Sequence, residues 1–294
     1  KQYAQMLKKK QGLTVYASAE VEGFIVDGIG AEQEYADKPF KLISTGGYYH
    51  SLPLDRLRQF IDKAAEAQRA MGFKNEKDHP EVAPSQFEMN FSYSDVLRAC
   101  DNIQLYKLVC RQVANSMGMT ASFLPKPFVG INGSGMHTNI SLSKNGKNIF
   151  YSKSGKDGLS DTAWSFVWKI LNHAPEMCLT LNSSVNSYRR LDPHFGSMIR
   201  IPVGNERSTR IEVRSVAPHS NPYLALYTII RTGLEGKPLV KDKDKRDRVR
   251  VLPDNINDAI KLFKASDFME KILGKDNQEK YADYKQMAAD RSPK

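Results

Sequence analysis

The stretch GLTVYASAEVEGFIVDG, from Gly12 to Gly28, decides the fold. Apolar and polar side chains alternate along it, it is rich in Val and Phe, and a glycine bounds each end. This pattern predicts a long β-strand. Glu20 and Glu22 are two residues apart, so their carboxylates project from the same face of that strand.

Other segments predict further strands and helices. Alternation predicts a strand within 81–93, a strand at 208–215, and two strands joined by a glycine-rich turn within 121–143. Apolar residues repeat at helical spacing in 52–73, 94–118, 159–174, 221–236 and 255–273. We expect Ser94 and Ser160 to be N-caps, Gly118 to end its helix, and Pro222 to lie in a first turn.

These elements predict the fold class. Strands and long helices are interleaved, but the strands come in hairpin-like groups without clean βαβ repeats. We expect an α/β fold of the α+β type, in which a curved, largely antiparallel sheet forms half a barrel with helices on its outside. No internal repeat and no linker-like segment argues for a second domain.

Composition favours a globular enzyme over other classes. Hydrophobic residues make up 40% and charged residues 26% of the 294 residues, and no run approaches the about 20 apolar residues of a membrane span. The chain opens on a helical pattern, not on a secretory signal. Three cysteines, Cys100, Cys110 and Cys178, are expected to be buried thiols in a reducing cytosol.

The net charge of +10 could suit nucleic acid, acidic membranes or a phosphate-bearing substrate. The most charged stretch, VKDKDKRDRVR (240–250), mixes both signs and predicts a solvated loop. The sequence carries no zinc-finger spacing, no aromatic RNA-binding motif and no basic zipper. We therefore expect no nucleic-acid or membrane partner.

The segment STRIEVRS, from Ser208 to Ser215, carries an unusual charged face. At a strand's period of two, Arg210, Glu212 and Arg214 point one way, and Ile211 and Val213 point the other. A row of Arg-Glu-Arg could be a ladder of exposed ion pairs, worth about 0–1 kcal/mol each. It could also hold a ligand that is both anionic and bound to a metal.

Acidic residues recur on the predicted strands. Each alone is more often an ordinary solvated side chain, and spacing does not show that they converge. If they do converge, they would repel one another unless protons or cations intervened. Carboxylates with one imidazole suit Mg²⁺ or Mn²⁺. The set comprises Glu20, Glu22, Glu81, Glu88, Glu212 and His137.

The segment VGINGSGMH (129–137) is a second unusual stretch. Its three glycines let the backbone approach a ligand and expose N–H groups. It is neither a Walker loop nor a dinucleotide-binding fingerprint. A plain hairpin turn is the alternative explanation.

Five long motifs resemble bacterial-type glutamine synthetases in their order and spacing, from about Val15 to the end of the chain. The resemblance implies an ATP-dependent ligase that joins ammonia to the γ-carboxylate of glutamate through γ-glutamyl phosphate. The motifs are EVAPSQFE, FLPKPFVGINGSGMHTN, VNSYRRLDPHF, IRIPVGNERSTRIEVRS and NPYLALYTIIRTGLEG.

The resemblance implies roles for individual residues. It assigns one metal ion to Glu22, Glu81 and Glu88, and a second to Glu20, His137 and Glu212. It assigns the glutamate-binding loop to Asn132 and Gly133, and the clamps on substrate carboxylates to Arg190 and Arg214. It assigns the ATP phosphates and catalysis to Arg200 and Arg210, and further nucleotide contacts to Glu76 and Ser141.

Some positions depart from the family pattern. Gly23 stands where many members have an aromatic residue, so we expect looser packing there. Between Phe195 and Gly196 the family carries an active-site flap, and before residue 1 it carries a small β-grasp domain. This sequence contains neither, either because they are deleted or because the sequence omits them. The second explanation is favoured, since both sides of the junction follow the pattern.

The resemblance also implies partners. Glutamate, ammonia and ATP would be substrates, with two or more Mg²⁺ or Mn²⁺ ions, in a cytoplasmic homo-oligomer of two stacked hexamers. Residues 1–294 would form the catalytic domain. A γ-glutamyl-polyamine ligase of the same superfamily and a non-catalytic regulatory paralogue remain alternatives.

Overall fold

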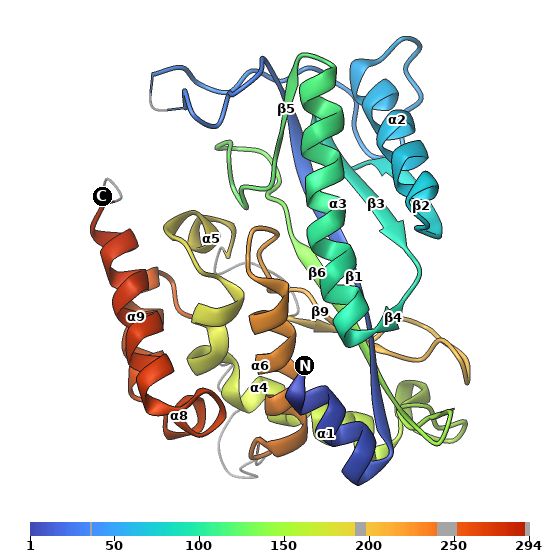
Figure 1. The fold of residues 1–294 in the computed structure, drawn as a ribbon, viewed down its shortest axis with the longest axis vertical. Coiled ribbons are helices and arrows are strands. Elements are labelled where there is room, and N and C mark those ends of the chain that lie inside the picture. Colours follow the sequence, from blue (N-terminus) through green and yellow to red (C-terminus); the bar gives the residue numbers. More distant parts are fainter. Residues whose placement is uncertain (36, 192–197, 240–251, 292–294) are drawn as a thin grey trace. The chain divides into compact units, whose positions relative to one another are not determined.

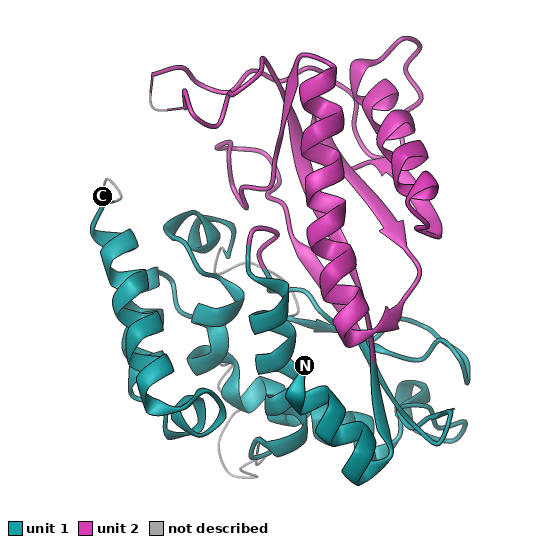
Figure 2. Ribbon diagram, viewed as in Figure 1, with its two compact units in different colours: residues 1–15, 140–216, 220–294 teal, residues 16–139, 217–219 magenta. Residues whose placement is uncertain are grey.

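The computed structural model describes residues 1–35, 37–191, 198–239 and 252–291 (Figure 1). They form two compact units (Figure 2). Unit 1 comprises residues 1–15, 140–216 and 220–294, and unit 2 comprises residues 16–139 and 217–219. The chain passes between the units within β1 (Leu13–Asp27) and β6 (Met136–Lys144), and again on either side of the short segment 217–219, so no linker-like composition marks the boundary.

The strand predicted between Gly12 and Gly28 is confirmed as β1 (Leu13–Asp27), and it organises the sheet of unit 2. Strands β3 (Gln86–Phe91), β4 (Ser94–Asp95) and β5 (Met119–Ser122) all pair with it in antiparallel orientation. Strand β2 (Asn75–Pro80) pairs with β3, also antiparallel. The registers place Glu22 opposite Glu88, and Glu88 opposite His79.

Two helices pack on this sheet. Helix α2 (Arg56–Ala70) contacts β2 and β3, and helix α3 (Val96–Ser116) contacts β5 and α2 (Figure 1). Their buried faces carry the predicted helical periodicity, including Leu57, Phe60 and Ile61, which are fully buried. The hydroxyl of Tyr106 on α3 donates to the carbonyl oxygen of Val21 at 2.8 Å, which fastens the helix to β1.

Unit 1 is mainly helical. Strand β6 (Met136–Lys144), whose first four residues belong to unit 2, pairs with β7 (Lys147–Asn148) and lies next to β9 (Ile211–Val213), which pairs with β8 (Ile199–Arg200). Helix α4 packs against α6 and α7, and α7 against α9. The helices are α1 (Gln2–Gln11), α4 (Asp161–Leu181), α5 (Val185–Arg190), α6 (Pro222–Glu235), α7 (Ile256–Lys264), α8 (Asp267–Leu273) and α9 (Lys275–Asp290), with a short 3₁₀ turn, η1 (Lys156–Gly158).

Several sequence predictions of helix ends are confirmed. The Ser160 hydroxyl accepts from the Ala163 N–H at 3.2 Å, Pro222 begins α6, and Gly118 follows α3 with φ of 75°. The predicted N-cap of α3, Ser94, is wrong by one residue, and the N-cap is Asp95. Ser94 belongs to β4 and pairs with Ala17 of β1. The carboxylate of Asp95 accepts hydrogen bonds from the N–H groups of Leu97 and Arg98.

Two helix predictions need correction in extent. The segment 255–273 is two helices and not one, because Ser266 caps the second by accepting from the Met269 N–H at 3.0 Å. The helix predicted to end near residue 174 continues through Pro175 to Leu181. Strand β2 was not predicted, since Lys77, Asp78 and Pro80 are poor strand formers.

The fold class is confirmed as a mixture of helices and antiparallel strands. Among the described residues the strand order runs from β2 to β8 without closing. Cys100, Cys110 and Cys178 are buried and unpaired, as predicted. The charged stretch 240–250 and the junction of Phe195 and Gly196 lie outside the described residues.

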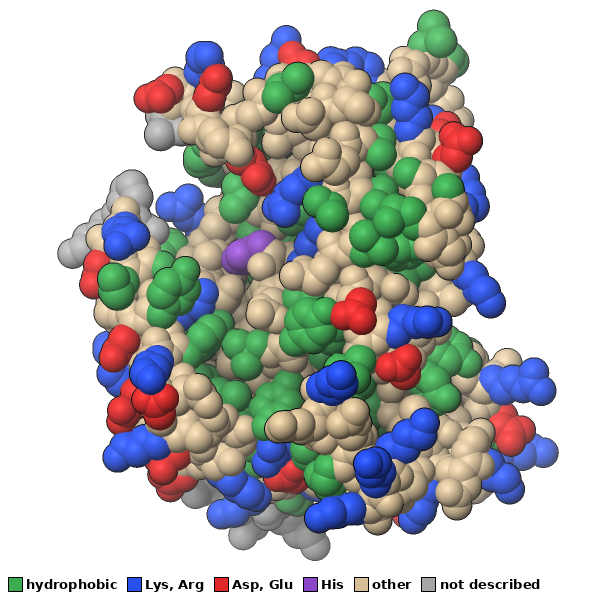
Figure 3. All heavy atoms as spheres, in the orientation of Figure 1, with side chains coloured by type: hydrophobic (Ala, Val, Ile, Leu, Met, Phe, Trp, Pro, Cys, Tyr) green, Lys and Arg blue, Asp and Glu red, His purple; other side chains and the backbone are tan. Residues whose placement is uncertain are grey.

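Two surface properties bear on partners. No helix in the described ranges is long and apolar enough to cross a membrane. On the face drawn in Figure 3, basic and acidic side chains are interspersed, with no continuous field of one sign.

Candidate functional site

A row of polar side chains crosses three neighbouring strands of unit 2. His79 on β2 lies opposite Glu88 on β3, and Glu88 lies opposite Glu22 on β1. Directly paired residues project from the same face of a sheet, so these side chains are neighbours. The Nε2 atom of His79 lies 3.7 Å from Oε1 of Glu88. All three residues are at most 7% exposed.

Glu81 joins this row from the turn between β2 and β3. Its Oε2 atom lies 3.6 Å from Nδ1 of His79. The turn is closed by hydrogen bonds from the Glu81 N–H to Gln86 O and from the Gln86 N–H to Ala83 O. One ligand atom each from His79, Glu81 and Glu88 lie within 4.8 Å of one another, a spacing that would admit one metal ion.

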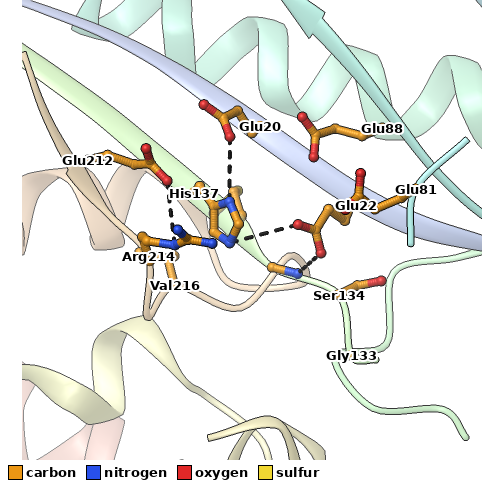
Figure 4. Close-up of polar contacts among 12 residues, drawn as sticks. Glu20, Glu22, Glu81, Glu88, Gly133, Ser134, His137, Glu212, Arg214 and Val216 are labelled. Carbon is orange, nitrogen blue, oxygen red and sulfur yellow. Dashed lines mark hydrogen bonds and ion pairs between the residues drawn. The ribbon is translucent and has the colours of Figure 1, made fainter. Parts of the chain in front are cut away.

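His137 lies on the other side of Glu22 (Figure 4). Its Nε2 atom is 3.7 Å from Oε1 of Glu22, and its Nδ1 atom is 3.5 Å from Oε2 of Glu20. The side-chain amide of Asn139 donates to Oε1 of Glu20 at 3.0 Å. Five of the six predicted metal ligands therefore gather in unit 2.

Two carboxylates of this cluster, Glu81 and Glu88, resist ionisation. Burial, followed by the charge of Glu22, raises the pKa of Glu88 to about 8 and the pKa of Glu81 to about 7. Among the described residues, no Lys or Arg lies within 4.0 Å of Glu81 or Glu88. The ionisable side chain beside both carboxylates that could carry a positive charge is His79. Burial lowers the pKa of His79, so its imidazole is neutral at neutral pH and supplies no compensating charge.

These residues fit a divalent cation. Buried carboxylates without a basic partner are costly when ionised, and a cation removes that cost. Carboxylate oxygens with a neutral imidazole form a donor set that Mg²⁺ or Mn²⁺ accepts.

The sequence analysis missed His79 in this cluster. The ring stacks on Tyr49, with centroids 4.2 Å apart and planes inclined by 15°, and its Nδ1 atom lies 3.0 Å from the Pro80 carbonyl oxygen. The sequence held a usable signal. His79 and Glu81 are two residues apart, the same spacing that identified Glu20 and Glu22.

The glycine-rich loop between β5 and β6 is closed at its neck. The Ser134 N–H donates to the Pro125 carbonyl oxygen at 2.7 Å, and the ammonium of Lys126 donates to the Ile131 carbonyl oxygen at 2.5 Å. Gly130 has φ of 80°, which explains the need for glycine there. The loop displays Asn132 to solvent and half-buries Gly133. The loop is held by its own hydrogen bonds and is longer than a plain hairpin turn.

Unit 1 contains the predicted Arg-Glu-Arg row. Glu212 on β9 is fully buried; Oε2 lies 2.8 Å from Nη1 of Arg200, and Oε1 lies 3.5 Å from Nε of Arg214. Ile211 and Val213 are also fully buried, as the alternation predicted. The buried guanidinium of Arg190 donates to the carbonyl oxygens of Arg214 at 2.9 Å and Val216 at 3.4 Å, so it supports the backbone of this row.

The remaining predicted site residues lie in both units. Arg210 precedes β9 in unit 1 and donates to the Ser208 carbonyl oxygen at 3.2 Å. Ser141 lies on β6 in unit 1. Glu76 is exposed on β2 in unit 2, where it accepts from the Ser92 hydroxyl at 3.0 Å. Their roles, and the grouping of Glu212 with Glu20 and His137, stay predictions.

The expectation of looser packing at Gly23 is wrong. Gly23 lies opposite Phe87, and a Cβ atom added to it would come within 2.7 Å of the Phe87 ring and 3.1 Å of the Phe123 ring. The space of a side chain at position 23 is therefore filled by the fully buried ring of Phe87.

Comparisons with known proteins identify the family. The family described as "Glutamine synthetase, catalytic domain" matches residues 1–292. Among curated relatives, glutamine synthetase of Methanosarcina mazei is 38% identical over 89% of this chain, and that of Staphylococcus aureus is 35% identical over 86%. The chain spans 66% and 65% of the lengths of these two relatives.

Solved structures share the fold. The cryo-EM structure of Plasmodium falciparum glutamine synthetase has a TM-score of 0.84 at 22% identity, over 97% of this chain and 74% of its own. A GmaS/ADP complex has a TM-score of 0.82 at 25% identity, over 98% of this chain and 72% of its own. Taken with the sequence match over residues 1–292, these likenesses mean that the chain belongs to the glutamine synthetase catalytic-domain family.

Proposed function

We propose that the protein is a glutamate–ammonia ligase, which uses ATP to join ammonia to the γ-carboxylate of glutamate and releases glutamine. The observation that carries the proposal is the buried row of His79, Glu88 and Glu22, extended by Glu81, without a basic residue beside Glu81 or Glu88 among the described residues. Such a row calls for a divalent cation, and ATP-dependent phosphoryl transfer uses one. The names of the curated relatives support the same activity.

The chemistry needs a cation because a carboxylate and a nucleotide phosphate repel each other. A divalent cation held by Glu22, Glu81 and Glu88, with a second held by Glu20, His137 and Glu212, would neutralise this charge during transfer. A free carboxylate is a poor electrophile toward an amine, and phosphorylation supplies the leaving group. Ammonium must also lose a proton before it attacks, and a carboxylate near the site would accept it.

The other predicted residues would bind the substrates. Asn132 and Gly133 would hold glutamate, and Arg190 and Arg214 would hold substrate carboxylates, Arg190 also by supporting the backbone at Arg214. Arg200, which is half-exposed beside Glu212, and Arg210 would stabilise charge on the transferring phosphoryl group. Glu76 and Ser141 would contact the nucleotide. The similar GmaS protein forms a complex with ADP, which supports a nucleotide site in this fold.

The test is direct. Purified protein incubated with glutamate, ATP, Mg²⁺ and ammonia should form glutamine and phosphate in equal amounts. Phosphate release that does not depend on ammonia would contradict the proposal. A higher rate with putrescine than with ammonia would instead indicate an amine ligase of the same superfamily.

We extend the proposal to the assembly and the compartment. Residues 1–294 would form the catalytic domain of a cytoplasmic homo-oligomer of twelve subunits in two stacked rings. The buried, unpaired cysteines support a reducing compartment. Light scattering on the purified protein tests the assembly, and a monomeric mass would contradict it.

A further inference from the structure

The side chain of Gln86 connects two parts of the proposed site. Gln86 lies on β3, two residues before Glu88, and is 1% exposed. Its Nε2 atom donates to the carbonyl oxygen of Gly133 and to the hydroxyl of Ser134, both at 3.1 Å, and lies 3.4 Å from Oε2 of Glu22. Its Oε1 atom accepts from the Ala83 N–H at 3.0 Å.

These contacts explain why the residue is a glutamine. An amide supplies two N–H donors and one acceptor, and the buried surroundings use both kinds. The two shorter contacts, to Gly133 O and Ser134 Oγ at 3.1 Å, use the two N–H donors, and Glu22 Oε2 lies farther away at 3.4 Å. A neutral amide makes these contacts without placing a second charge beside Glu22.

The two oxygens of Glu22 have different surroundings. Oε2 accepts from the Gly135 N–H at 2.7 Å and faces Gln86, so it is held by the glycine-rich loop and by the Gln86 amide. Oε1 faces Nε2 of His137 at 3.7 Å. The carboxylate is thereby oriented by the loop through one oxygen and presents the other to the cluster.

We infer that Gln86 is a positioning residue that couples occupancy of the glycine-rich loop to cation binding at Glu22. This inference rests on the proposed function, in which the loop holds glutamate and Glu22 holds a metal ion. A substrate that fixes Gly133 also fixes the Gln86 amide and hence Glu22. By linkage, a cation at Glu22 then tightens binding of glutamate by the same factor.

The experiment measures Mn²⁺ binding by calorimetry, with and without saturating glutamate. The variant is Gln86→Met, which keeps the length of the side chain and removes its donors. The metal site under study is the one whose Mn²⁺ affinity is lost in Glu88→Gln. We expect Gln86→Met to weaken Mn²⁺ binding there by about tenfold. The factor by which glutamate tightens Mn²⁺ binding should fall about threefold or more.

Gln68→Met is the matched control. Gln68 is a fully buried glutamine on α2 in the same unit, and its amide contacts Met89 Sδ, Cys110 Sγ and the side chain of Asn75. Its replacement should leave Mn²⁺ affinity and the effect of glutamate unchanged, whatever it does to stability. In turnover, Gln86→Met should raise KM for glutamate more than it lowers kcat, whereas a merely structural loss would lower stability alone.

Ser134→Ala is a second variant that removes one loop contact and leaves a much smaller cavity. It should reduce the effect of glutamate in the same direction, by less than Gln86→Met does. Unchanged Mn²⁺ affinity and an unchanged glutamate effect in Gln86→Met would overturn the inference. If that variant does not fold, an unchanged glutamate effect in Ser134→Ala would overturn it. Failure of the proposed function would appear in the wild-type protein, as absent glutamine formation.

Discussion

Two clusters of charged side chains in this molecule contrast in how their carboxylates are stabilised. In unit 1, Glu235 on α6 accepts from Arg231 at 2.9 Å and from the Tyr3 hydroxyl at 2.8 Å, and lies 3.8 Å from Lys271. The Arg231 guanidinium also lies over the Tyr3 ring, 4.7 Å from its centroid. In unit 2, Glu81 and Glu88 lie beside His79, and no Lys or Arg of the described part of the chain lies within 4.0 Å of either carboxylate.

The pKa values follow this contrast. Burial alone would raise the pKa of Glu235, but hydrogen bonds from Arg231 and Tyr3 outweigh it and hold the pKa below its usual value. Burial and neighbouring carboxylates raise the pKa of Glu88 to about 8, with nothing to offset them fully. Glu235, which a basic side chain stabilises, contributes to stability. Glu88, which has a neutral imidazole beside it, is suited to binding a cation.

The largest expected effect concerns activity. Glu88→Gln keeps the shape of the side chain and removes its charge, so glutamine formation should fall about 1,000-fold, since a metal ion contributes several kcal/mol to such a reaction. Without metal, the variant should unfold at the same temperature as the wild type or higher. Glu235→Gln is the matched control, and should lower thermal stability while leaving kcat unchanged. Equal losses of activity in both variants would contradict the assignment of Glu88 to metal binding and of Glu235 to stability.

The next effect concerns pH. In the folded protein the pKa values of Glu81 and Glu88 lie at about 7 and about 8, above the value of about 4.3 for an unfolded Glu. The folded state then binds more protons than the unfolded state between pH 5 and 7, so stability falls as pH rises through this window. The expected loss in metal-free protein is on the order of a few kcal/mol.

Other groups act in the same range, and the measurement must separate them. The lowered pKa of His79 works in the opposite direction, and so, above pH 7, does that of Lys107, which burial lowers to about 7. Calorimetry in chelator should show a steeper fall between pH 5 and 7 for the wild type than for Glu88→Gln. Saturating Mn²⁺ should flatten the wild-type profile. Parallel profiles for the two proteins in chelator would contradict the assignment.

A smaller effect is expected from the paired cluster. Arg231→Met leaves Glu235 without its main donor, so the free energy of unfolding should fall by about 2 kcal/mol at pH 7. Denaturant titration measures this, and Mn²⁺ affinity should stay at the wild-type value. A change in metal affinity would show that the two clusters are not independent.

The smallest effect sharpens the contrast between the half-buried pair of Arg231 and Glu235 and a more exposed pair. Arg56 and Asp27 form an ion pair of 2.9 Å at the surface of unit 2. Arg56→Ala should lower the free energy of unfolding by about 0.5 kcal/mol, and less at high salt. A cost as large as that of Arg231→Met would show that burial does not decide the strength of these pairs.

Local patterns predicted much of this structure. The alternation around Glu20 and Glu22 predicted both β1 and the common face of its acidic side chains. Helical spacing predicted α3, α4 and α6, because each presents one apolar stripe to a core. These features depend on residues close in sequence, which composition and spacing reveal.

The missing parts depend on long-range pairing. The row from His79 through Glu88 to Glu22 follows from two strand registers, which sequence spacing does not specify. Strand β2 lacks strand-forming residues and exists because β3 pairs with it. The role inferred for Gln86 depends on contacts between the glycine-rich loop and β3, which no local pattern in the sequence predicts.

The close approach of Gly23 and Phe87 has an evolutionary consequence. The aromatic ring occupies the volume that any side chain at position 23 would need. Adding a side chain at Gly23 alone would therefore push the backbone that carries Glu22 or Glu88, and shortening Phe87 alone would leave a cavity. Relatives with a bulky residue at the first position should carry a small one at the second, so the pair is expected to covary across the family.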